Sequence, residues 1–114
     1  MLDALKNLGS LPGLMAKARE MQEKMKAAQE ELAKRKISAD AGGGMVEATV
    51  NGRMELVKVR IDKARVDLND TELLEDLIVA AVHAAQVKAG DMVQTEMQKV
   101  TADLGLPTGL PGMP

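Results

Sequence analysis

The 114-residue sequence contains no cysteine and no aromatic residue, and it has one histidine, His83. The absence of cysteine excludes disulfide bonds, thiolate metal sites and thiol catalysis. The absence of Phe, Tyr and Trp removes the side chains that usually anchor a small core, and it excludes base stacking on aromatic rings. No stretch approaches the roughly 20 apolar residues that cross a bilayer. The amino-terminal sequence lacks the order of a signal peptide, so we expect a cytoplasmic protein.

Hydrophobic residues nevertheless make up 46% of the chain and charged residues 28%, a composition too apolar for a disordered polymer. The length fits a single domain over residues 1–114, with a flexible amino-terminal segment 1–11 and a flexible Gly/Pro-rich tail 105–114. A monomer this short buries only a modest fraction of its surface. Oligomerisation is therefore expected to contribute to stability.

Charge is distributed unevenly along the chain. Residues 1–65 carry 13 basic and 9 acidic side chains, whereas residues 66–114 carry 2 basic and 8 acidic ones. Such a dipolar chain can present a local cationic face although its net charge is −2. The alternative is that the two halves neutralise each other in a folded dimer.

The first predicted helix carries a seam of apolar residues at alternating spacings of four and three, which is a heptad pattern. The seam residues are Leu14, Ala18, Met21, Met25, Ala28 and Leu32. Acidic residues precede basic ones by four positions on the other faces, an order that supports a helix. Ser10, Pro12 and Gly13 bracket its start, and helix-forming residues give way at Ile37 and Ser38.

The central segment changes to an alternating pattern that predicts two strands, at 46–51 and 57–62. Between them, Asn51-Gly52 suits a two-residue type I′ turn. Gly42–Gly44 is expected to form the turn that joins a further short strand, 36–41, to this hairpin. The sequence therefore predicts a three-stranded antiparallel meander.

A second helix is predicted from Thr71 to Asp103, with Asn69 or Asp70 as its N-cap. At 1.5 Å per residue it would be roughly 50 Å long, so its far half must project from so small a domain. The fold class is therefore α+β, an α-β-β-β-α protomer with two projecting helices. An Ala-rich face of this helix is expected to meet a second copy across a twofold axis, since small side chains let helices approach closely. The residues assigned to this dimer interface are Leu77, Ala80, Ala81, Ala84 and Ala85.

Catalytic constellations are nearly absent from the sequence. His83 has no Ser, Cys or carboxylate at helical spacing, so a structural or interfacial role is expected for it. Gly42–Gly44 lacks the Lys-Ser/Thr of a phosphate loop and is better explained as a turn. Glu72, Glu75 and Asp76 could contact one ion, but capping of the helix dipole explains them more simply. We expect no enzymatic activity, metal, cofactor or small-molecule substrate.

The basic residues give a stronger indication of function than the candidate catalytic residues do. A solvated protein surface is the usual role of such side chains, and the functional alternative is a surface that contacts DNA phosphates with little reading of sequence. The candidate DNA-binding residues are Lys17, Arg19, Lys24, Lys26, Lys34, Arg35, Lys36, Lys58 and Arg60. Among them, Lys34, Arg35 and Lys36 form the most compact cluster in the sequence.

Three stretches carry a resemblance to a known family: LMAKAREMQEKMKAAQEELAK, AGGGMVEATVNGRMELVKVRID and LEDLIVAAVHAA. With these stretches and its Gly/Pro/Met-ending tail, the chain resembles the YbaB/EbfC family of bacterial nucleoid-associated proteins, and the resemblance covers roughly residues 12–114. The resemblance implies a homodimer whose projecting helices form tweezer-like arms proposed to grip duplex DNA. It further implies a nucleoid location, limited sequence preference and effects on transcription.

A second interpretation is a prefoldin-like holdase or a coiled-coil interaction scaffold. Helical arms flanking a hairpin also describe such chaperones, and methionine suits promiscuous apolar contacts. The methionines in question are Met15, Met21, Met25, Met92 and Met97. Those on the heptad seam are explained more simply as core residues.

Overall fold

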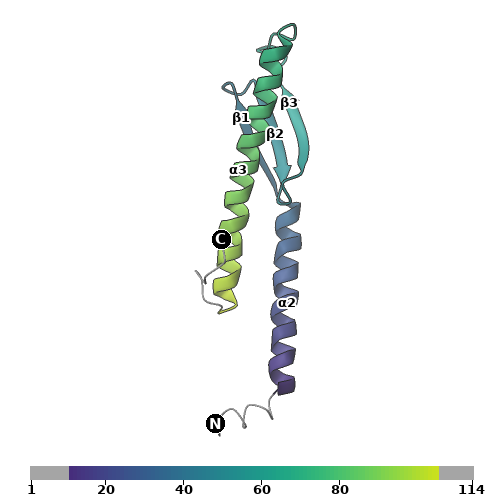
Figure 1. Ribbon diagram of the computed structural model, residues 1–114, viewed down its shortest axis with the longest axis vertical. Helices are drawn as coiled ribbons and strands as arrows, with labels where there is room; N and C mark the ends of the chain where they lie inside the picture. Colours follow the sequence, from purple (N-terminus) through teal and green to yellow (C-terminus); the bar gives the residue numbers. More distant parts are fainter. Residues whose placement is uncertain (1–10, 106–114) are drawn as a thin grey trace.

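The computed structural model describes residues 11–105 of the protein, which have the predicted α-β-β-β-α order (Figure 1). Its elements are α2 (Leu11–Lys34), β1 (Lys36–Ala41), β2 (Val46–Asn51), β3 (Leu56–Ile61) and α3 (Thr71–Asp103). The predicted flexible ends fall outside this range except for Leu11, which begins α2, and Gly105, which follows α3. Neither α2 nor α3 is both long and apolar enough to cross a membrane.

The molecule is elongated, with extents of 77 × 23 × 18 Å. The helix α2 runs toward the sheet, while α3 crosses the sheet and continues beside α2 in the opposite direction (Figure 1). All residues of the first ten positions of α2, 11–20, are exposed. The far half of α2 therefore projects as an arm. The half of α2 nearer the sheet contacts α3, and Leu32 in this half is buried.

The three strands form one antiparallel sheet in the order β1-β2-β3, as predicted. Lys36 lies opposite Asn51 across the first pair of strands, and Val46 lies opposite Ile61 across the second. A register shift beside Thr49 and Val50 interrupts the second pairing. The predicted glycine turn joins β1 to β2, and each of Gly42–Gly44 has a positive φ angle, which suits glycine.

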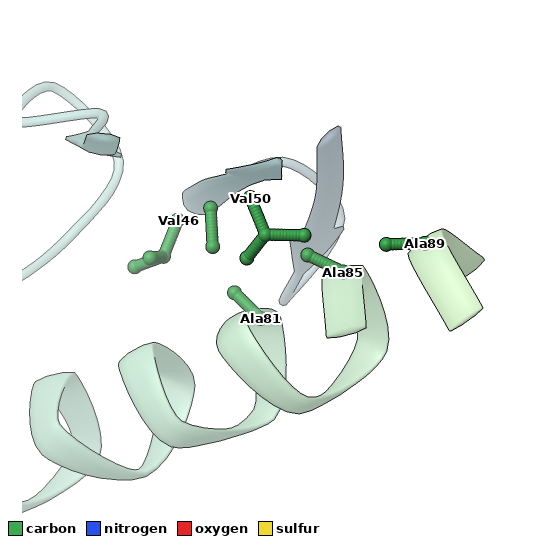
Figure 2. Close-up of a cluster of buried hydrophobic side chains, with 6 residues drawn as sticks. Val46, Val50, Ala81, Ala85 and Ala89 are labelled. Atoms are coloured by element: carbon green, nitrogen blue, oxygen red, sulfur yellow. The ribbon is translucent and has the colours of Figure 1, made fainter. Parts of the chain in front are cut away.

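The core lies between the sheet and α3 (Figure 2). Its fully buried residues come from alternate positions of β2 and from one stripe of α3: Val46, Ala48, Val50, Ala81, Ala85 and Ala89. Alanine lets the helix backbone approach the strand closely, which compensates for the missing aromatic residues. The close approach leaves no room for larger side chains on this stripe of α3.

This core corrects part of the predicted dimer interface. Ala81 and Ala85 were expected to meet a second copy, but both are fully buried against the sheet of their own chain. Leu77 also packs against this core, Ala84 is half-buried, and Ala80 is exposed. The sequence pattern identifies a face that is covered but cannot tell whether a sheet or a second protomer covers it.

The ends of α3 agree with prediction. The helix begins after Asp70, whose Oδ1 accepts a hydrogen bond from the backbone N–H of Leu73 at 3.2 Å. A carboxylate at this position satisfies an otherwise unpaired helix N–H group and complements the helix dipole.

The helix α2 starts three residues before the heptad seam. Pro12 lies in its first turn, where the missing N–H of proline has no consequence because N–H groups there have no partner within the helix.

The β2–β3 turn differs from prediction. Instead of a two-residue type I′ turn at Asn51-Gly52, the segment between β2 and β3 has four residues, 52–55. The backbone N–H of Met54 donates to the carbonyl of Asn51 at 3.0 Å, and Met54 itself has a φ of 65°. This pattern is a type I turn followed by a left-handed residue. Gly52 is required for another reason, because a Cβ there would lie 2.7 Å from the carbonyl carbon of Leu32.

Candidate nucleic-acid interface

All nine basic residues predicted to contact DNA are exposed, but they do not form one continuous surface. Four lie on the arm of α2, three lie at the junction of α2 and β1, and two lie on β3. The arm of α2 carries the residues Lys17, Arg19, Lys24 and Lys26. The junction contains Lys34, Arg35 and Lys36, and β3 contributes Lys58 and Arg60.

The arm residues divide between two sides of α2. Lys17 and Lys24 are seven residues apart and therefore share one side of the helix, and the same holds for Arg19 and Lys26. The two pairs are separated by about 200° around the helix axis, since each residue turns the helix by about 100°. Lys24 is also engaged with Glu20, at 3.1 Å. One straight duplex along the arm cannot contact both pairs equally.

The junction residues are consecutive in sequence but separate in space. Arg35 turns toward α3, where its Nη1 lies 3.6 Å from Oε1 of Glu96 and 4.0 Å from the sulfur of Met92. Lys34 and Lys36 instead line a hollow on another side of the junction. The most compact cationic cluster of the sequence is therefore divided, because the chain changes from helix to strand at this point.

On β3, Lys58 and Arg60 lie on the sheet face opposite α3. Arg60 is paired with Glu47 of β2 at 3.7 Å, and Lys58 lies opposite Thr49. The hydroxyl of Thr49 shares a hydrogen bond of 2.7 Å with Ser38. This face is polar and of mixed charge, so it offers less free positive charge than the junction.

Two hollows flank the end of α2, and both include Arg53 of the β2–β3 loop. The outer hollow, of about 470 Å³, is lined by Glu30, Ala33, Lys34, Lys36, Asn51, Arg53, Glu55 and Val57. The inter-helix hollow, of about 450 Å³, is lined by Lys26, Gln29, Glu30, Leu32, Ala33, Gly52, Arg53, Val93 and Met97. Arg53 thus lies between the arm cation Lys26 and the junction cations.

Arg53 is absent from the residues predicted to contact DNA. The strand register contains the signal that could have identified it. Lys36 begins β1 and pairs with Asn51, the last residue of β2, so the residues after Asn51 must lie beside the end of α2. A predicted hairpin with this register would have brought Arg53 to the junction.

The two helices differ in charge. The helix α2 has five basic and four acidic residues, whereas α3 has two basic and six acidic ones. Cations therefore concentrate on α2, on its junction with β1 and on the adjacent hairpin, while α3 presents mainly carboxylates. A polyanion is attracted to the first of these surfaces and repelled by the second.

Other chemistry has little support within the described part of the chain. His83 is exposed on α3, where its expected structural or interfacial role stays a prediction. Among residues 11–105, no three His, Asp or Glu side chains gather in a way that could hold a metal ion.

The Arg35–Glu96 pair leads to a testable prediction. Replacing Glu96 with Gln removes a carboxylate and releases both Arg35 and Lys99, which lies 3.4 Å from the same oxygen, so duplex DNA affinity is expected to rise about threefold at low salt. The free energy of unfolding should change by less than about 1 kcal/mol, because both partners are partly exposed. Fluorescence anisotropy with a labelled duplex measures the affinity. Glu75→Gln, which removes an exposed carboxylate near the other end of α3, is the control; an equal rise in both variants would contradict a specific effect of Arg35.

The chain is similar to known proteins in sequence and in fold. A sequence profile described as the YbaB/EbfC DNA-binding family matches residues 7–104. A nucleoid-associated protein of Gemmatimonas aurantiaca is 47% identical over 98 residues, covering 86% of this chain and 94% of the relative. A nucleoid-associated protein of Thermoanaerobacter sp. is 45% identical over 105 residues, covering 87% of this chain and 95% of the relative. An uncharacterized protein from Helicobacter pylori has a similar fold, with a TM-score of 0.53 and 22% identity over 76% of this chain and 96% of that one.

Proposed function

Since the chain belongs to the YbaB/EbfC DNA-binding family, we propose that it binds duplex DNA as a homodimer with limited sequence preference. Relatives that share nearly half of its residues are called nucleoid-associated proteins, so we infer that it acts on the nucleoid and thereby affects transcription. The observation that carries the proposal is the family match over residues 7–104.

Phosphate contacts explain how such a protein would bind without reading sequence. Lysine and arginine side chains release the counterions condensed on DNA, and this contribution is independent of base sequence. The exposed cations on α2 and at its junction with β1 supply these contacts. The chain has no aromatic residue with which to stack bases, so it favours duplex over single-stranded DNA.

Unpartnered apolar side chains support the homodimer. Val79 and Val87 of α3 are 68% and 51% exposed, and Leu56 and Val57 of β3 are 48% and 47% exposed. The helix α3 packs mainly on β1 and β2, which leaves the β3 side of the sheet less covered. Burial of exposed apolar side chains such as these favours association. A second copy would bury them and place two sets of DNA-binding cations on one particle.

Two measurements test this proposal. Anisotropy titrations with duplexes of unrelated sequence, at about 50 mM salt where electrostatic contacts are strong, should give affinities within about tenfold of one another. Sedimentation equilibrium at micromolar concentration should give twice the chain mass of 12.2 kDa. Absence of duplex binding at low salt would refute DNA binding, and a stable monomer would refute the dimer. Suppressed aggregation of a model client without DNA binding would instead favour the holdase interpretation.

A further inference from the structure

We propose that Arg53, Lys34 and Lys36 form a site for one phosphodiester group of duplex DNA in the outer hollow, with Arg53 as its central ligand. The inference rests on the proposed DNA binding and assigns a specific contact within it. Arg53 comes from the β2–β3 loop, Lys34 from the end of α2 and Lys36 from the start of β1. The fold thus brings three cations from three segments to one hollow.

These cations are available to a ligand. Within residues 11–105, no carboxylate oxygen lies within 4 Å of the charged nitrogens of Arg53, Lys34 or Lys36. Two carboxylates, Glu30 and Glu55, also line the hollow and offset two of its three positive charges. Arg35 differs from all three cations, because it is paired with Glu96. The hollow therefore retains uncompensated positive charge where a phosphate can enter.

The backbone at Arg53 is held in place before any ligand binds. Oδ1 of Asn51 accepts hydrogen bonds from the backbone N–H groups of Arg53 at 2.9 Å and Glu55 at 3.1 Å. The carbonyl of Met54 accepts a hydrogen bond from Nε2 of Gln86 on α3 at 3.3 Å. Gly52 packs against the backbone of α2. The loop is thus fixed by its own strand and by both helices, so ordering it costs little on binding.

Arginine suits a phosphate better than lysine does in such a site. Its planar guanidinium can donate two parallel hydrogen bonds to one phosphate, whereas lysine contributes a flexible point charge. A rigid loop at the base of the α2 arm would fix the position of the duplex relative to that arm. The exposed cations on the arm could then contact neighbouring phosphates.

Salt-dependent anisotropy of the full-length protein with a labelled duplex tests the site. Arg53→Gln is expected to weaken binding about eightfold at about 0.1 M salt for each copy of the site that contacts DNA. The slope of log affinity against log salt should become shallower by about 0.9 per copy. Lys63→Gln is the matched control, because it also removes one exposed cation but lies beyond β3, at the opposite end of the sheet. This control should retain nearly the affinity and slope of the unmodified protein.

A second variant separates position from charge. Asn51→Ala removes the side chain that holds the loop while leaving every cation in place, so affinity should fall about threefold with little change in the salt slope. Circular dichroism confirms that each variant is folded. If the unmodified protein binds DNA and Arg53→Gln behaves like Lys63→Gln, the proposed site is wrong although DNA binding stands. If the unmodified protein does not bind DNA, the proposed function itself fails.

Discussion

Replacing Arg19 and Lys26 together with Gln is expected to weaken duplex binding about 60-fold at about 0.1 M salt for each chain that loses these two phosphate contacts. The two residues share one side of α2, and Lys26 lines the inter-helix hollow together with Arg53. Because Arg53 lines both hollows, a duplex whose phosphate occupies the outer hollow can also contact this side of the arm. Fluorescence anisotropy over a salt series measures both the loss of affinity and the change in slope.

The matched control is the double variant Lys17→Gln with Lys24→Gln. It removes the same charge from the same helix but from a side about 200° away, and Lys24 is already engaged with Glu20. Its affinity should fall by less than about fivefold, through the general loss of positive charge. Equal losses for the two double variants would show that the arm attracts DNA without a preferred side.

Replacing Ala85 with Asp is expected to have the largest effect on stability. Ala85 is fully buried among Val46, Val50 and Ala81, so the new carboxylate would lie in an apolar core without a partner (Figure 2). An unpaired buried charge lowers the free energy of unfolding by about 3–5 kcal/mol, which is a large part of the total stability of a domain this small. Denaturant titration followed by circular dichroism should show a largely unfolded protein or a much lower midpoint.

Gln94→Asp provides the comparison for this variant, because Gln94 is exposed on the same helix. Its midpoint should stay close to that of the unmodified protein, since exposed substitutions usually change stability by less than about 0.5 kcal/mol. Equal stability of Ala85→Asp and Gln94→Asp would mean that α3 does not pack on the sheet through Ala85.

Local patterns predict most of the fold. The alternation of Val46, Ala48 and Val50 identifies a strand with one covered face because successive side chains point to opposite sides of a sheet. The position of Asp70 identifies the start of α3 because a carboxylate there satisfies unpaired N–H groups. Both signals depend only on residues close in sequence, so they can be recognised without knowledge of the tertiary structure.

Features that depend on tertiary contacts cannot be predicted from local sequence patterns. The Asn51-Gly52 pair indicates a two-residue turn, but Gly52 is needed because the loop packs against the end of α2, and the left-handed residue is Met54. Ala81 and Ala85 look available for a second copy because the sequence does not show which partner covers them. Although Arg35 lies between Lys34 and Lys36 in the sequence, its side chain lies on a different side of the junction from theirs. Its pairing with Glu96 depends on the position of α3, which the local sequence does not show.

The salt dependence of duplex binding by the unmodified protein tests most directly the claim that cations of α2, its junction with β1 and the β2–β3 loop bind DNA phosphates. Three phosphate contacts per chain, one each from Arg19 and Lys26 and one shared by Arg53, Lys34 and Lys36, predict a slope of log affinity against log salt of about −2.7 for each engaged chain. A slope near zero, with affinity that persists at high salt, would contradict binding through these cations.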